Sequence, residues 1–226
     1  MTKHLLTSGL IAGLVAGLLA ALLQFVFVVP LLLESELYES GVRAHFDAVG
    51  GIQSPAGAPS VWADVSRNIG TLAMNAVAYI GFALVLVAGF ALAESTGHRV
   101  TARTGMIWGL AGFVALHLAP AFSQPPVLPG TVGAALDQRQ YWWTACVAAT
   151  ALGLSALSFG RGPLMVLIGL VLIAAPHIFG APRIDVYFGI TPPELAALFT
   201  SRSLGTAGAS WVALGTLAGW LWSRQD

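Results

Sequence analysis

The chain has 226 residues, of which 57% are hydrophobic and 9% are charged, and its ten basic residues balance its ten acidic ones. A soluble globular domain carries about 25% charged residues, so a soluble fold of this composition would expose apolar surface over most of its area. The balanced charge excludes the excess of basic residues that is typical of nucleic-acid-binding proteins. The single cysteine, Cys146, excludes a disulfide framework and an all-cysteine zinc site. The composition fits a chain whose solvent is the lipid bilayer.

Six apolar segments predict transmembrane helices, because about 20 apolar residues in a helix cross a bilayer core of about 30 Å. They span residues 5–33, 69–93, 104–121, 141–159, 163–178 and 204–222. We therefore expect an all-α polytopic bundle that forms a single membrane domain over residues 1–226. The first segment is long enough to tilt or to bend at Pro30, and it exceeds the roughly 7–15 apolar residues of a signal peptide, so it is expected to remain as a signal anchor.

Glycines recur at every fourth position in three of these segments. Small residues at this spacing let helix backbones approach closely, which favours association in lipid, where no hydrophobic effect drives it. They are Gly9, Gly13 and Gly17, then Gly105 and Gly109, then Gly215 and Gly219. The pattern predicts close contacts between helices rather than a ligand site.

The connections between the predicted helices differ in length and charge. Three long connections, residues 34–68, 122–140 and 179–203, fall on one side of the membrane and hold most of the acidic residues. The termini and the two short connections fall on the other side, where basic residues are dense near the helix ends. Because basic residues near helix ends favour the cytoplasmic side, the termini are predicted to be cytoplasmic.

The candidate functional residues are ionisable groups at or near membrane depth, where such groups are costly. His117 and His177 lie near the ends of the third and fifth predicted helices, which run in the same direction, so both imidazoles are expected on the side of the long connections. Glu34 and Glu36 follow the first helix on that side. Imidazole and carboxylate together suit a borderline divalent metal such as cobalt, nickel or zinc. The alternative is structural, since a histidine in a last helical turn also bonds terminal carbonyls.

Two polar residues lie deeper, Gln24 in the first predicted helix and Asn75 in the second. They either line a translocation path or form interhelical hydrogen bonds. The sequence lacks a phosphate-binding loop, a zinc-protease helix motif and a nucleophile elbow. We therefore predict no enzymatic activity and no tightly bound cofactor.

Several segments together resemble the CbtA family, the predicted cobalt transporter subunit of bacteria. They are residues 27–31 with 34–36, 109–120, 125–130 with 139–143, and 175–182, and their order and spacing extend over nearly the whole chain. The resemblance implies a multi-pass protein of the bacterial cytoplasmic membrane that takes up Co²⁺ for cobalamin synthesis. It also implies a partner, the small single-helix CbtB protein with a histidine-rich end. It supplies no ligand set, so the metal ligands predicted here (His117, His177, Glu34 and Glu36) rest on topology and chemistry.

Three other interpretations stay open at this point. Two histidines on two helices also suit a haem-binding membrane protein. A scaffold subunit without a site would only position another membrane protein. A transporter of nickel or another divalent metal would use the same ligands.

Overall fold

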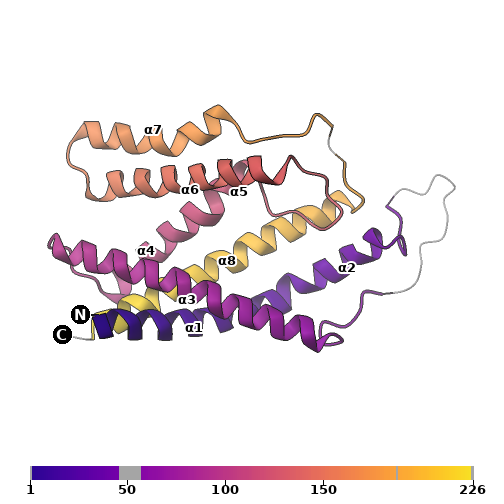
Figure 1. The fold of residues 1–226 in the computed structure, drawn as a ribbon, viewed down its shortest axis with the longest axis horizontal. Helices are drawn as coiled ribbons and strands as arrows, with labels where there is room; N and C mark the ends of the chain where they lie inside the picture. The colour runs from indigo at the N-terminus through magenta and orange to yellow at the C-terminus, as the bar shows by residue number, and fades with distance from the viewer. Residues whose placement is uncertain (1, 46–56, 187, 225–226) are drawn as a thin grey trace. The chain divides into compact units, whose positions relative to one another are not determined.

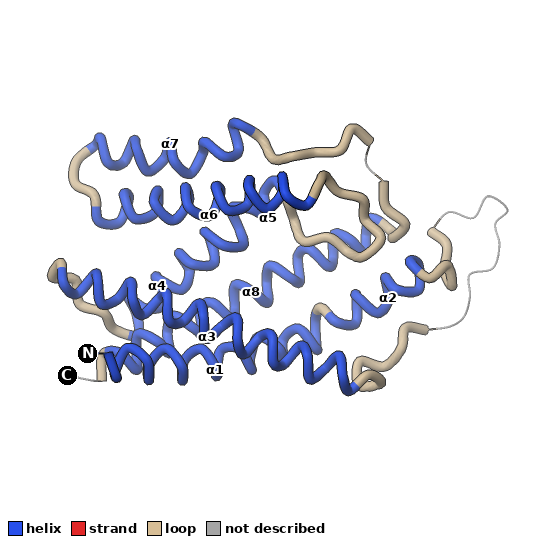
Figure 2. Tube along the Cα trace, viewed as in Figure 1, coloured by secondary structure: helices blue, strands red, loops and turns tan. Residues whose placement is uncertain are grey.

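The computed structural model describes residues 2–45, 57–186 and 188–224 of the chain. These residues form helices joined by loops, and β-structure within them is limited to one isolated bridge between Thr131 and Gly189 (Figures 1 and 2). The helices are α1 (Thr2–Phe27), α2 (Val29–Glu39), α3 (Val65–Ser95), α4 (Ala102–Phe113), the π-helix η1 (Val114–Leu118), α5 (Ala119–Ser123), α6 (Leu136–Phe159), α7 (Pro163–Phe179) and α8 (Pro193–Trp222). The predicted all-α class is confirmed.

Four helical stretches of the described chain are long and apolar enough to cross a membrane. They are His4–Phe27, Val65–Ser95, Ala102–Ser123 and Leu136–Phe159, and α7 is a shorter apolar helix. Helix α8 contains the sixth predicted span but is not one of these four stretches. The structure is that of a polytopic helical membrane bundle.

The first predicted helix is interrupted near Pro30. Helix α1 ends at Phe27 and α2 resumes at Val29. Proline has no amide N–H, and its ring crowds the carbonyl four residues earlier, here that of Val26. The helix then continues past the predicted end at residue 33 as far as Glu39.

Other helices also begin earlier than predicted, and in α3 and α8 the early start has a signal of its own. The Asp64 carboxylate accepts a hydrogen bond of 2.9 Å from the Arg67 amide, which caps α3 at Val65 instead of residue 69. Helix α8 begins at Pro193 instead of residue 204, with Glu194 in its first turn. Proline suits a first helical turn, and an acid there complements the helix dipole.

The chain divides into two compact units. The first comprises Met1–Pro30, Ser60–Phe113 and Ser203–Asp226, and the second comprises Leu31–Pro59 and Val114–Arg202. The prediction of a single membrane domain stays a prediction.

In the first unit, α1 lies along α3 in the close contact that the glycine spacing predicts. A Cβ atom placed on Gly17 would lie 2.7 Å from the carbonyl oxygen of Asn75, and one on Gly13 would clash with the backbone of Ile80. Helices α4 and α8 meet in the same way, with Gly105 against Gly215 and Gly219. The predicted role of these glycines is confirmed.

In the second unit, α6 and α7 form an antiparallel hairpin. Gly162, with φ 82°, adopts the left-handed backbone that starts α7 after the tight turn, a conformation that glycine accepts without strain. Further along the hairpin, a Cβ on Gly153 would lie 2.7 Å from the carbonyl oxygen of Gly169. Segments η1 and α5 also pack against α6. The two segments that carry His117 and His177 therefore both pack against α6.

Candidate functional site

His177 lies in the last turn of α7, directly after Pro176. The helix ends two residues later, and Gly180 then takes φ 84°, which ends the helix in a conformation that favours glycine. The Gly180 amide donates to the carbonyl of Pro176 at 3.1 Å. The sequence correctly predicts the position of His177 at a helix end beside a proline.

The imidazole of His177 is half-buried and contacts side chains from two other elements of the second unit. Its Nδ1 atom lies 3.2 Å from the Oγ atom of Ser123, the last residue of α5. Its Nε2 atom lies 4.0 Å from the Sγ atom of Cys146 on α6. The rings of Phe122 and Trp142 meet it edge to face, with centroid distances of 5.4 and 5.9 Å. The imidazole is thus held on several sides.

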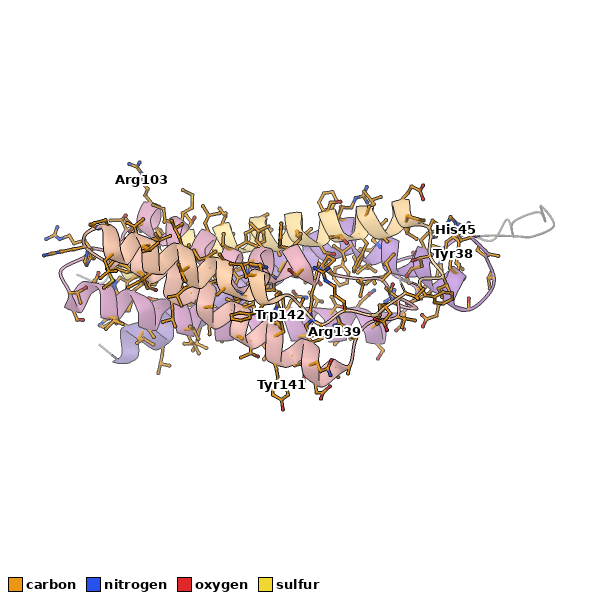
Figure 3. All side chains as sticks on the ribbon, turned by 90° about the horizontal axis from the view of Figure 1, so that it is seen from above. Tyr38, His45, Arg103, Arg139, Tyr141 and Trp142 are labelled. Atoms are coloured by element: carbon orange, nitrogen blue, oxygen red, sulfur yellow. The ribbon has the colours of Figure 1, made fainter. Side chains whose placement is uncertain are left out.

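Trp142 also fixes the helix end that carries His177. Its indole Nε1 donates a hydrogen bond of 3.0 Å to the carbonyl of Pro176. Figure 3 shows Trp142 directed toward α7, whereas Tyr141 points away from the helices and is 76% exposed. This bond ties α6 to the last turn of α7 and so keeps His177 next to Cys146.

His117 lies in η1, within the helical run that continues from α4 into α5. Pro120 lies two residues after Leu118, the last residue of the π-helix. It lacks the amide N–H that an α-helix would use there. A π-helical turn accommodates such a disruption, and π-helical turns are frequent at functional sites. The structure therefore places His117 on a locally widened helix that packs against α6.

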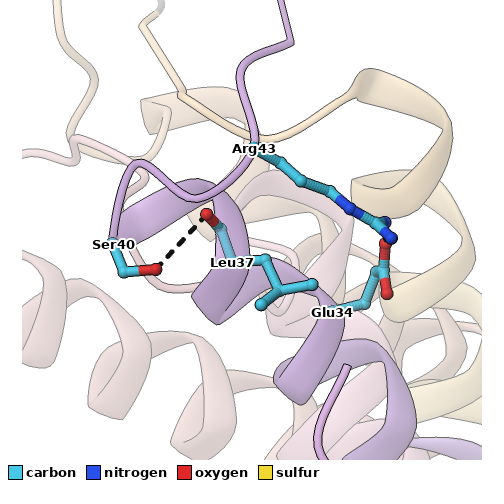
Figure 4. Close-up of polar contacts among 4 residues, drawn as sticks. All are labelled: Glu34, Leu37, Ser40 and Arg43. Atoms are coloured by element: carbon cyan, nitrogen blue, oxygen red, sulfur yellow. Dashed lines mark hydrogen bonds and ion pairs between the residues drawn. The ribbon is translucent and has the colours of Figure 1, made fainter. Parts of the chain in front are cut away.

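Glu34 and Glu36 lie on α2, not in a loop after a helix, so this part of the prediction is wrong. The Glu34 carboxylate forms an ion pair with Arg43, which follows the end of α2 (Figure 4). The Arg43 amide donates to the carbonyl of Leu37 at 2.9 Å, and this turn brings its guanidinium back to Glu34. Residues two apart on a helix do not face each other, so the exposed Glu36 side chain points to a different side.

The predicted ligands are not gathered into one cluster. In the part of the chain that the structure describes, no group of three or more histidine, cysteine, aspartate or glutamate side chains is placed to hold a metal ion. The ligand set of His117, His177, Glu34 and Glu36 stays a prediction. What the structure does bring together is His177 with Ser123 and Cys146.

Gln24 and Asn75 face each other between α1 and α3. Each amide nitrogen donates to the other amide oxygen, at 3.1 Å in both directions. Asn75 Nδ2 also donates to the carbonyl of Thr71 at 2.9 Å. Of the two roles considered from the sequence, the interhelical hydrogen bond is the one present in this structure.

Ser123, Trp142 and Cys146 were not predicted from the sequence to be functional residues. A signal for two of them was present: Trp142 and Cys146 are four residues apart and therefore share one face of α6. That face meets the end of α7 that carries His177. Considered by itself, Cys146 only excludes a disulfide framework and an all-cysteine zinc site.

The fold defines a polytopic helical membrane protein in which an imidazole, a thiol and a hydroxyl meet inside one unit. The family model described as "probable cobalt transporter subunit (CbtA)" matches residues 2–223, and the chain belongs to this family. No curated protein and no solved structure matches the chain.

Proposed function

We propose that this protein is the membrane-embedded subunit of a Co²⁺ uptake system in the bacterial cytoplasmic membrane, which supplies cobalt for cobalamin synthesis. The observation that carries the proposal is the family match over residues 2–223, nearly the whole chain. The word "subunit" in the family description supports a partner, which we propose to be a small single-helix protein of the CbtB kind. The termini are proposed to lie in the cytoplasm, from the distribution of basic residues.

The chemistry of the second unit supports a transition metal as the transported substrate. His117 and His177 both lie on segments that pack against α6. Imidazole binds cobalt and its neighbours in the first transition series well, whereas magnesium and calcium prefer oxygen ligands. Transport requires an ion to bind well enough to enter and weakly enough to leave. A site with only a few protein ligands, completed by water, meets that requirement better than a site in which protein ligands enclose the ion completely.

Glu34 and Glu36 are proposed to attract the cation rather than to complete a rigid ligand sphere. Acidic side chains raise the local concentration of cations, and the two carboxylates project to different sides of α2. Glu34 already has a partner in Arg43. A Co²⁺ ion would therefore compete with the guanidinium for this carboxylate.

Gln24 and Asn75 are proposed to border the path further into the bilayer. Their amide oxygens are acceptors that could contact a hydrated cation, but each oxygen now accepts the partner's N–H. Passage would require this pair to open, as in a gate. The glycine contacts of α1 and α3 next to it leave little other space.

The proposal is tested by uptake of radioactive Co²⁺ in cells that lack the gene. The cells carry the wild-type protein, the His117→Ala/His177→Ala variant or an empty vector, and protein levels are compared by immunoblotting. Uptake restored by the wild type alone supports both transport and the histidine ligands. Uptake restored equally by the variant supports transport but contradicts the ligands. No uptake from well-expressed wild type, even with the single-helix partner co-expressed, would contradict the transport function.

A further inference from the structure

The most specific chemical arrangement among the described residues is the meeting of Cys146 and His177 where α6 packs against the last turn of α7. The Cys146 side chain is fully buried, and its Sγ atom lies 4.0 Å from His177 Nε2. We propose that this thiol and this imidazole are two ligands of one binding point for the transported divalent ion. The inference rests on the proposed transport function and adds a soft sulfur ligand to it.

The separation of the two atoms fits a shared metal ion. Zinc, a close chemical neighbour of cobalt, binds imidazole nitrogen at about 2.1 Å and thiolate sulfur at about 2.3 Å, so two such ligands in a tetrahedral site lie about 3.6 Å apart. The observed 4.0 Å exceeds this by a few tenths of an ångström. A difference of this size lies within the range of a small side-chain rotation.

Ser123 prepares His177 for this role. Metal-bound histidines almost always use their second ring nitrogen to donate a hydrogen bond to an oxygen, which fixes the tautomer and the ring orientation. The Ser123 hydroxyl lies 3.2 Å from Nδ1 and is placed to accept this bond. The Nε2 lone pair is then directed to the side of the thiol.

A second buried polar group neighbours the thiol. Thr150, one helical turn beyond Cys146 on α6, is fully buried, and its hydroxyl lies beside the sulfur. A thiolate accepts a hydrogen bond from a hydroxyl far better than a thiol does, so the Thr150 hydroxyl would stabilise the metal-bound form of Cys146.

Binding is an exchange of a proton for the metal, with no change of oxidation state. The S–H bond of Cys146 breaks as the sulfur–metal bond forms, and the proton passes to water. Because His177 is half-exposed and Cys146 is buried, the ion meets the imidazole first and the thiol second. A thiolate–imidazole pair selects cobalt, nickel and zinc over the more abundant magnesium, which takes oxygen ligands.

The test is a spectroscopic titration of the purified full-length protein in detergent with CoCl₂. Co²⁺ bound to a thiolate gives an intense ligand-to-metal charge-transfer absorption in the near ultraviolet, which oxygen or nitrogen ligands alone do not give. We expect this band in the wild type, its loss in Cys146→Ser and a much weaker band in His177→Ala. It should persist in excess MgCl₂. The matched control is His98→Ala, a change at an exposed histidine of the first unit, which should leave the band intact.

Each outcome separates the metal site from the transport function. No band in folded wild type, or an unchanged band in Cys146→Ser, overturns the site whatever the uptake assay gives. A band that depends on Cys146, in a protein that restores no uptake, supports the site and contradicts transport. Size-exclusion chromatography and thermal unfolding of each variant show whether it is folded, and Cys146→Ser changes one atom only, so it is the variant that decides.

Discussion

Gln24 of α1 and Asn75 of α3 bind each other through two reciprocal hydrogen bonds, each 3.1 Å long. Each amide donates one hydrogen bond to the other and accepts one from it, so both amides have a partner inside the apolar helix pair. A buried amide without a partner costs roughly 2–7 kcal/mol, so the pair strongly favours the register in which the two residues meet. The same register places Gly17 against the backbone of Asn75.

Replacing one member of this pair should cost more than replacing both. Asn75→Leu leaves the Gln24 amide without its partner, so we expect a loss of about 1–3 kcal/mol in the free energy of unfolding. The Gln24→Leu/Asn75→Leu variant should recover part of that loss. Unfolding of the wild type, Gln24→Leu, Asn75→Leu and the double variant in mixed micelles gives the coupling energy, which we expect to be about 0.6–1.7 kcal/mol. Strictly additive losses would contradict a direct interaction.

The contact of α1 with α3 should tolerate no added atom at Gly17. A Cβ there would lie 2.7 Å from the Asn75 carbonyl oxygen, so Gly17→Ala must push the backbones apart. We expect it to destabilise the protein by about 1–3 kcal/mol, which thermal unfolding in detergent measures. Gly81→Ala on α3 is the matched control, because no atom lies within 4 Å of its Cβ position, and it should be neutral or stabilising. Equal effects of the two changes would disprove the close contact.

Co²⁺ uptake should fall in acid. Protons compete with the metal for the lone pair of an imidazole, so uptake that depends on histidine ligands should decrease as the external pH is lowered. Initial rates of Co²⁺ uptake across a pH series measure this. Any residual uptake by the His117→Ala/His177→Ala variant should not show this decrease in rate at acidic pH. A wild-type rate that stays constant from about pH 5 to about pH 7.5 would exclude histidine ligands.

Releasing Glu34 from its ion pair should strengthen the attraction of the cation. Arg43→Gln removes the guanidinium that competes for this carboxylate, so the half-saturating Co²⁺ concentration should fall, most clearly at low ionic strength. The effect on stability should stay below about 1 kcal/mol, because both side chains are partly exposed. Glu34→Gln should shift the half-saturating concentration the other way. A shift in the same direction for both variants would contradict a role in attracting the ion.

The sequence predicts the helical membrane class and the glycine contacts well, because both depend on local features. Hydropathy identifies residues at membrane depth, and glycines four apart identify the faces that touch, as with Gly105 and Gly215. Hydropathy does not show where a helix continues beyond the apolar segment. For that reason Glu34 and Glu36 were expected in a loop, although α2 carries them.

The site was only partly predictable because its contacts join residues far apart in the chain. The proline beside His177 and the helix end were visible in the sequence. The approach of Cys146 to His177 was not, since it depends on how the α6–α7 hairpin aligns around Gly153 and Gly169. The π-helical turn that holds His117 was not predictable either, because no local pattern distinguishes it from the α-helix that precedes Pro120.

The central claim, that this protein carries Co²⁺ with the help of His117 and His177, is tested most directly by initial rates of Co²⁺ uptake at matched protein levels. The comparison includes the wild type, His117→Ala/His177→Ala and the control His4→Ala/His98→Ala, whose histidines are exposed in the first unit. We predict that the wild type and the control take up Co²⁺ equally and that the His117→Ala/His177→Ala variant does not exceed the empty vector. Equal uptake by all three proteins, or by none of them in the presence of the partner, would contradict the account.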